Sequence, residues 1–259
     1  MGLIKYRFHS SIISMDTEIN IIIPDKRLSE GNNKYPVLYL LHGAGGDCDS
    51  WLRYSSIERY AEREQFAVVM PSAYNTCYSN MAHGIPYFTF LSEELPERVE
   101  AVFPIANIKE KRFVAGLSMG GRGAFLWAMR RPDFFSGAAS LSGSLDILPM
   151  AQRMKEENNL LALERFHNAF GDLNTLSQRD NDIYVLAKRL SESPEKPPMF
   201  LYACGKEDVR YQEQFLTFLK YCEKVDFKID SFDGHGDHDF DYWDTAINKV
   251  IRWMSSTLK

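Results

Sequence analysis

Short apolar or β-branched runs recur along the chain and alternate with longer stretches of helical pattern. Several of these runs are apolar throughout, which is typical of strands covered on both faces. The alternation of strands and helices predicts a mostly parallel sheet with right-handed crossovers, and therefore an α/β fold. We expect strands at 19–23, 36–41, 66–70, 112–115, 138–141, 199–203 and 225–229, and helices at 50–64, 91–102, 120–130, 207–223 and 241–258.

Two segments depart from this alternation. No helical pattern separates the first extended runs, up to Pro24, so we expect an antiparallel hairpin at one edge of the sheet. Residues 145–197 lie between two predicted core strands and are rich in charged residues and helix formers. The segment is too long for a plain crossover, which predicts a helical cap over the carboxyl edge of the sheet. No repeat or linker divides the chain, so residues 1–259 are predicted to form one domain with this insertion.

The composition narrows the class of protein. Of 259 residues, 45% are hydrophobic and 25% charged, as in ordinary globular proteins. The net charge of -5, with no basic stripe, argues against a nucleic acid as partner, because phosphate binding needs a basic surface.

No run approaches the roughly 20 apolar residues of a membrane span, and the start lacks a signal-peptide core. The four dispersed cysteines are interpreted as free thiols. We therefore expect a cytoplasmic protein that is not in a membrane. Its oligomeric state, a homo-oligomer included, stays open.

The first chemical signal lies in the segment RFVAGLSMGGRGAF. It runs from a predicted strand through a GxSxG turn, centred on Ser118, into an apolar helix. In such a turn the strained serine exposes its hydroxyl, and the flanking Gly116 and Gly120 lack the Cβ atoms that would clash where strand and helix cross. This context favours Ser118 as a nucleophile. The alternative is a serine at a glycine-rich helix start that caps the helix or binds phosphate, although no P-loop lysine follows.

A second glycine-rich loop follows the predicted strand 36–41. A serine nucleophile that attacks a carbonyl creates an oxyanion, which needs preorganised N–H donors. The amide of Met119, directly after the nucleophile, is one expected donor. The loop HGAGG supplies the second, for which we choose Ala44. The alternative interpretation of this loop is a simple flexible turn.

The acid and the base should follow the serine in the order Asp or Glu, then His. Glu207 and Asp208 come directly after the predicted strand 199–203, where a carboxylate can reach an imidazole. We prefer Asp208 as the acid. The alternative is that Glu207 and Asp208 exchange roles. His235 and His238 lie on one later loop, and either could accept the serine proton.

The same loop permits a different reading. Its histidines are spaced HxxH among acidic side chains, which could hold a metal ion. The spacing matches neither an HExxH helix nor an EF-hand loop, so we predict no metal site. The acidic residues are Asp233, Asp237, Asp239 and Asp241.

Taken together, these residues make the chain resemble the esterase D family, and within it the small bacterial tributyrin-esterase-like serine esterases. The resemblance implies an α/β-hydrolase fold, supports Asp208, Ala44 and Met119, and selects His238 over His235 as the base. One departure is Arg122, where relatives usually have an aromatic residue; we expect it to alter only the surface near the helix start. The segments that carry the resemblance are LLHGAGGDCDSW, VVMPSAYNTCYSNM, EELPERVEAVFPI, GLSMGGRGAF, LSGSLDI, CGKEDVRY and GHGDHDFDYWD.

The sequence thus predicts cofactor-free hydrolysis of short-chain acyl esters through an acyl-enzyme on Ser118. The acyl group should lie under the cap, with Trp51, Tyr78 and Met81 as candidates for its walls; ordinary packing is the alternative for all three. Rival functions are a thioesterase or S-formylglutathione hydrolase, a feruloyl or acetyl-xylan esterase, and a non-catalytic binding protein that keeps the fold.

Overall fold

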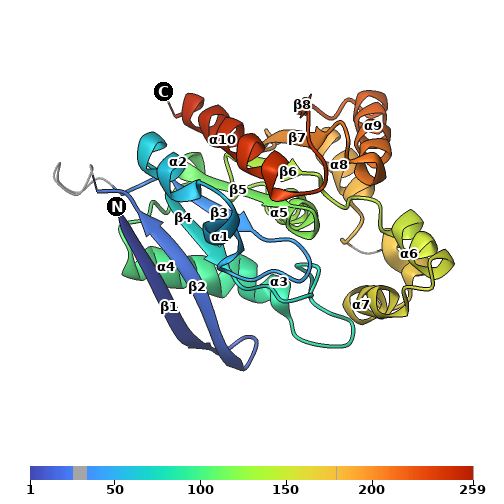
Figure 1. Ribbon diagram of the computed structural model, residues 1–259, viewed down its shortest axis with the longest axis horizontal. Coiled ribbons are helices and arrows are strands. Elements are labelled where there is room, and N and C mark those ends of the chain that lie inside the picture. Colours follow the sequence, from blue (N-terminus) through green and yellow to red (C-terminus); the bar gives the residue numbers. More distant parts are fainter. Residues whose placement is uncertain (26–33, 179, 259) are drawn as a thin grey trace.

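The structure, a computed structural model, describes residues 1–25, 34–178 and 180–258. An eight-stranded sheet with the order β1-β2-β4-β3-β5-β6-β7-β8 forms its centre (Figure 1). The strands from β3 to β8 run parallel, while β1 and β2 form an antiparallel hairpin at one edge, as the sequence predicts. The strands are β1 (Gly2–Ser10), β2 (Met15–Ile23), β3 (Val37–Leu41), β4 (Ala67–Pro71), β5 (Arg112–Leu117), β6 (Gly137–Leu141), β7 (Met199–Gly205) and β8 (Asp230–Gly234).

Helices cover both faces of this sheet, which confirms the predicted α/β class. Strands β3, β4 and β6 are buried along their whole length, because apolar side chains point to helices on either side. One face packs against α1 (Ser50–Tyr54), α2 (Ile57–Glu64) and α10 (Phe240–Ser256). The other face packs against α3 (Tyr87–Thr89), α4 (Leu95–Val102), α5 (Met119–Arg130), α8 (Ile183–Ser191) and α9 (Val209–Lys224). A π-helical turn spans Phe90–Glu94, and 3-10 turns span Lys109–Lys111 and Leu173–Gln178.

The predicted cap segment, 145–197, divides into two parts, apart from residue 179, which lies outside the described residues. Helices α6 (Ile147–Glu156) and α7 (Leu160–Phe170) pack on each other and project from one side of the molecule (Figure 1). The amides of Ala82 and His83 donate to carbonyls at the end of α7, which ties this pair to the loop after β4. Helix α8, by contrast, packs against α5 and α9 beside the sheet. Only the α6–α7 pair therefore projects as a cap would.

Two predicted elements differ from the structure. The last strand is β8, five residues beyond the expected 225–229. The expected segment 225–229 is not a strand. It is apolar because Phe227 packs against the core just after α9. The helix expected at 50–64 is broken at Ser55 and Ser56 into α1 and α2. None of the helices in the described ranges is long and apolar enough to cross a membrane.

Candidate active site

Ser118 lies at the sharp turn between β5 and α5. Its backbone angles are φ 52° and ψ -117°, a conformation that residues with a side chain rarely adopt. The turn is possible because of two glycines. A Cβ atom on Gly116 would lie 2.4 Å from the Gly120 carbonyl oxygen, and one on Gly120 would lie 2.5 Å from the Leu41 carbonyl oxygen. The elbow predicted from GxSxG is therefore present, with its serine at the carboxyl end of the sheet.

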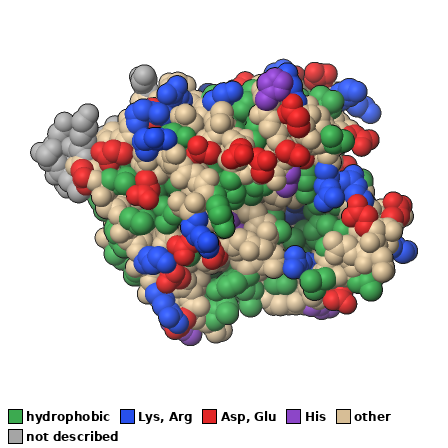
Figure 2. Space-filling model, in the orientation of Figure 1, with side chains coloured by type: hydrophobic (Ala, Val, Ile, Leu, Met, Phe, Trp, Pro, Cys, Tyr) green, Lys and Arg blue, Asp and Glu red, His purple; other side chains and the backbone are tan. Residues whose placement is uncertain are grey.

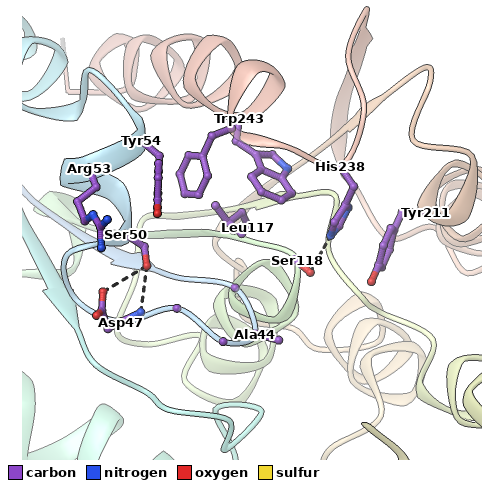
Figure 3. A pocket seen from close by; sticks show the side chains of 14 residues that line it. Ala44, Asp47, Ser50, Arg53, Tyr54, Leu117, Ser118, Tyr211, His238 and Trp243 are labelled. Carbon is purple, nitrogen blue, oxygen red and sulfur yellow. Dashed lines mark hydrogen bonds between the residues drawn. The ribbon is translucent and has the colours of Figure 1, made fainter. Parts of the chain in front are cut away.

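A chain of hydrogen bonds joins Ser118, His238 and Asp208. The Ser118 Oγ lies 3.0 Å from His238 Nε2 (Figure 3). On the other side of the ring, His238 Nδ1 lies 2.8 Å from an Asp208 carboxylate oxygen. Because a carboxylate only accepts, the imidazole proton belongs on Nδ1, which leaves Nε2 to accept from the serine hydroxyl. The Asp208 side chain is 1% exposed and that of His238 28%. The Asp208 carboxylate is thus fully buried, while the His238 imidazole can reach solvent.

Two aromatic rings hold the imidazole of His238. Tyr211, in the first turn of α9, stacks on it with ring centroids 4.1 Å apart, and Trp243 meets it edge-on at 4.8 Å (Figure 3). Burial raises the pKa of the Tyr211 hydroxyl, against an opposing effect of the neighbouring Ser118 hydroxyl. Tyr211 therefore borders both His238 and Ser118. Sequence reasoning missed it, although it comes three residues after Asp208.

The two adjacent carboxylates bind two different histidines of one loop. Glu207 lies 2.9 Å from His235 Nδ1 and accepts the Gly236 amide, and these bonds lower the pKa of the Glu207 carboxyl. His235 is 92% exposed. The structure thus brings Asp208 and His238 to Ser118, and it leaves Glu207 and His235 as a separate surface pair.

The loop after β3 presents Ala44 beside Ser118. Within the described residues, neither the Ala44 amide nor the Met119 amide has a hydrogen-bond partner, so both can donate to a ligand.

His42, which sequence reasoning did not single out, holds the loop after β3. Its Nε2 accepts from the Ala73 amide at 2.8 Å, so Nδ1 carries the proton and donates to the Gly43 carbonyl at 2.7 Å. Burial lowers the pKa of His42, which keeps the ring neutral. The signal in the sequence that could have identified His42 is its position between a buried strand and a glycine-rich loop.

Two cavities meet at Ser118. The larger, of about 480 Å³, is lined by the Ala44 loop, α1, His238, Phe240 and Trp243 (Figure 3). The smaller, of about 110 Å³, lies on the cap side, where apolar side chains of α6 and α7 form its wall. In Figure 2 a hollow opens between the body of the molecule and the α6–α7 pair, with acidic side chains gathered along the rim above it. Ile147, Met150, Met154 and Phe166 are the apolar residues of the smaller cavity.

The residues expected to form the substrate pocket do not line either of these cavities. Trp51 is buried and donates from its indole to the Leu41 carbonyl. Tyr78 is buried and donates to the His42 carbonyl, and Met81 packs against Gly84. Trp51 and Tyr78 thus pack in the core and support the loop after β3, and Met81 is half-buried outside both cavities.

Arg122 also requires a correction. We expected it at the surface, but only 2% of it is exposed, and it lines the smaller cavity. Its guanidinium donates to the carbonyls of Cys77 and Asn181 and lies over the Phe170 ring. The backbone around Asn181, which belongs to the insertion, covers the position that sequence reasoning treated as open.

The acidic loop at 233–241 does not gather its side chains. Within the described residues, no group of three or more His, Cys, Asp or Glu side chains lies close enough together to hold a metal ion. The histidines of this loop have instead the carboxylate partners given above.

Comparison with known proteins agrees with this geometry. A profile of the Esterase family matches residues 10–254. An acetyl esterase of Caldicellulosiruptor saccharolyticus is 33% identical over 265 aligned positions, which cover 98% of each chain. Two Staphylococcus aureus structures, each 32% identical over 98% of both chains, superpose well. They are the fluorophosphonate-binding serine hydrolase FphF, with a TM-score of 0.86, and the S-formylglutathione hydrolase FrmB, with 0.85. The chain therefore belongs to the Esterase family and is a serine hydrolase of carboxylic esters with the α/β-hydrolase fold.

Proposed function

We propose that the protein hydrolyses esters of short acyl groups through an acyl-enzyme on Ser118. The observation that carries this proposal is the unbroken series of hydrogen bonds from Ser118 through His238 to Asp208. A neutral imidazole whose Nε2 accepts from the serine hydroxyl is poised to take its proton as the oxygen attacks. The buried Asp208 carboxylate then stabilises the imidazolium and keeps its tautomer.

The oxyanion of the tetrahedral intermediate would be stabilised by the amides of Ala44 and Met119. Both are free of other partners within the described residues, and Met119 begins α5, where the helix dipole favours negative charge. His42 supports this arrangement indirectly, because its two hydrogen bonds fix the loop that carries Ala44.

The two cavities suggest how an ester lies across Ser118. The leaving oxygen must receive its proton from His238, and His238 lines the larger cavity but not the smaller. The alcohol therefore belongs in the larger cavity and the acyl group in the smaller, apolar one. Its volume of about 110 Å³ favours short acyl chains. After the alcohol leaves, a water on the His238 side would be activated to release the acid.

A thioester is the second candidate substrate. The larger cavity is wide enough for a bulky leaving group, and the Staphylococcus aureus neighbour FrmB is named an S-formylglutathione hydrolase. The chemistry on the acyl side would be unchanged, because only the leaving atom differs.

The test is turnover of p-nitrophenyl esters from acetate to octanoate, with an S-acyl thioester alongside. We expect activity to decline beyond short chains, to be lost in Ser118→Ala and His238→Ala, and to persist in the matched control His235→Ala. Labelling by a fluorophosphonate should require Ser118. Activity that survives Ser118→Ala would overturn the mechanism, and an intact protein without activity or labelling would favour a binding role.

We also propose that the protein works in the cytoplasm. All four cysteines are buried free thiols, which supports a reducing compartment. Fractionation of the source cells, followed by detection of the protein, would test this, and recovery from the medium would contradict it.

A further inference from the structure

The small cavity beside Ser118 carries two positive charges and no negative one. Arg122 of α5 and Arg165 of α7 both line it, whereas none of its described lining residues is Asp or Glu. Both arginines line the same cavity as Cys77, and their charges lower the pKa of its thiol against the larger raising effect of burial. A pocket for a plain short acyl group would need only the apolar side chains of α6 and α7.

Neither arginine has a carboxylate partner among the side chains that the structure describes. Arg122 bonds only to the Cys77 and Asn181 carbonyls, and its Nε is buried without a partner within the described residues. The Asp182 carboxylate, whose charge acts on Arg122, accepts instead from the amides of Tyr184 and Val185. Arg165 is half-buried and forms no hydrogen bond or ion pair in the part of the chain that the structure describes.

Arg122 stays charged in this environment. Burial lowers its pKa to about 10, which is still far above neutral pH. A buried cation without a counter-ion is costly, and an anion in the cavity would offset that cost. A guanidinium binds a carboxylate with charge-assisted, often bidentate hydrogen bonds, and Arg122 has donors left for them.

We propose that the smaller cavity binds an acyl group that ends in a carboxylate, held by Arg122 and Arg165. The preferred substrates are then monoesters of short dicarboxylic acids, with the ester carbonyl at Ser118. Arg122 follows Ser118 by four residues, which is about one helical turn, so only a few carbon atoms separate the two ends of such an acyl group. This inference rests on the proposed function, because it assigns the acyl group to that cavity.

The test compares three p-nitrophenyl esters: the monoester of glutaric acid, its methyl-capped neutral analogue and the pentanoate. Uncatalysed hydrolysis of each is subtracted. We expect the wild-type kcat/KM for the monoester to exceed that for the capped ester about tenfold or more, as charge-assisted hydrogen bonds imply. Arg165→Gln should remove most of this preference and leave acetate turnover within about threefold. Lys155→Gln, which removes a positive charge from the exposed face of α6, is the matched control and should keep the preference.

Arg122→Met should also abolish the preference, but this buried variant could fail to fold, so the Arg165 variant decides the outcome. Equal kcat/KM values for the charged and capped esters in the wild type would overturn the proposal. So would an Arg165→Gln variant that keeps the full preference or loses activity equally on all three esters. Failure of the proposed function looks different, since acetate turnover and labelling of Ser118 would then be absent in every variant.

Discussion

The phenol ring of Tyr211 lies parallel to the imidazole of His238, with 11° between the ring planes. The stack fixes the orientation of the His238 imidazole, and the hydroxyl of the same tyrosine borders Ser118. The two contacts can be separated by substitution.

We expect Tyr211→Phe to keep most of the activity and Tyr211→Ala to lower kcat about tenfold. Phenylalanine preserves the stack, whereas alanine frees the imidazole and loses an aromatic contact of about 0.5–1.5 kcal/mol. Steady-state kinetics on a short ester will check this. If the phenylalanine variant falls as far as the alanine variant, the hydroxyl and not the ring is the important group.

Asp208→Asn should lower kcat by roughly 10⁴-fold with little loss of stability. An amide in place of the carboxylate favours the wrong imidazole tautomer, as in other Ser-His-Asp sites. Asp208 also caps α9 by accepting the Tyr211 amide, and asparagine can cap equally well.

Asp208→Ala separates these two roles, because it removes the cap as well and should cost about 1 kcal/mol more in unfolding free energy. Parallel kinetic assays and urea denaturation will measure both quantities. Equal stability of the asparagine and alanine variants would argue against the capping role.

His42 predicts a specific pH dependence of stability. Burial lowers its pKa in the folded protein from the ordinary value of 6.5, so the unfolded chain takes up a proton first as the pH falls. The contribution of neutral His42 to the free energy of unfolding is thus complete above pH 6.5. It declines as the pH falls from there towards the pKa of His42 in the folded protein.

We therefore expect the free energy of unfolding, measured between pH 5 and 7.5, to change less steeply with pH in His42→Gln than in the wild type. The carboxyls with lowered pKa, such as those of Glu94 and Glu207, titrate below this window in the unfolded chain, near 4.5. Identical slopes in the two proteins would contradict the assignment.

Gly120→Ala should destabilise the protein by about 1–3 kcal/mol and impair activity, because the new methyl group would press on the Leu41 carbonyl oxygen. Gly234→Ala is the control, since the nearest atom to its added methyl group, on Tyr242, lies at an ordinary 3.7 Å. Thermal unfolding of both variants tests the comparison, and equal losses would show that the contact with the Leu41 carbonyl oxygen is not the cause.

The sequence predicts the buried strands well because apolar runs and burial coincide there. It places the last strand wrongly because β8, with the sequence DSFDG, is a largely exposed edge strand without an apolar pattern. Ser118 and the preference for Asp208 follow from chain order and loop position, which are local features, whereas the choice of His238 over His235 rests on the family resemblance. The environments of Arg122, Trp51 and Tyr78 depend on which distant backbone covers them, and no local pattern records that.

The paired bonds of Glu207 with His235 and of Asp208 with His238 couple the lengths of two loops. Adjacent residues on one loop meet residues three apart on the other, so deleting a single residue from either loop would put both pairs out of register together. Loop exchange between related enzymes must therefore move the segments after β7 and β8 as one unit, or the graft will misplace the imidazole even when every side chain is present.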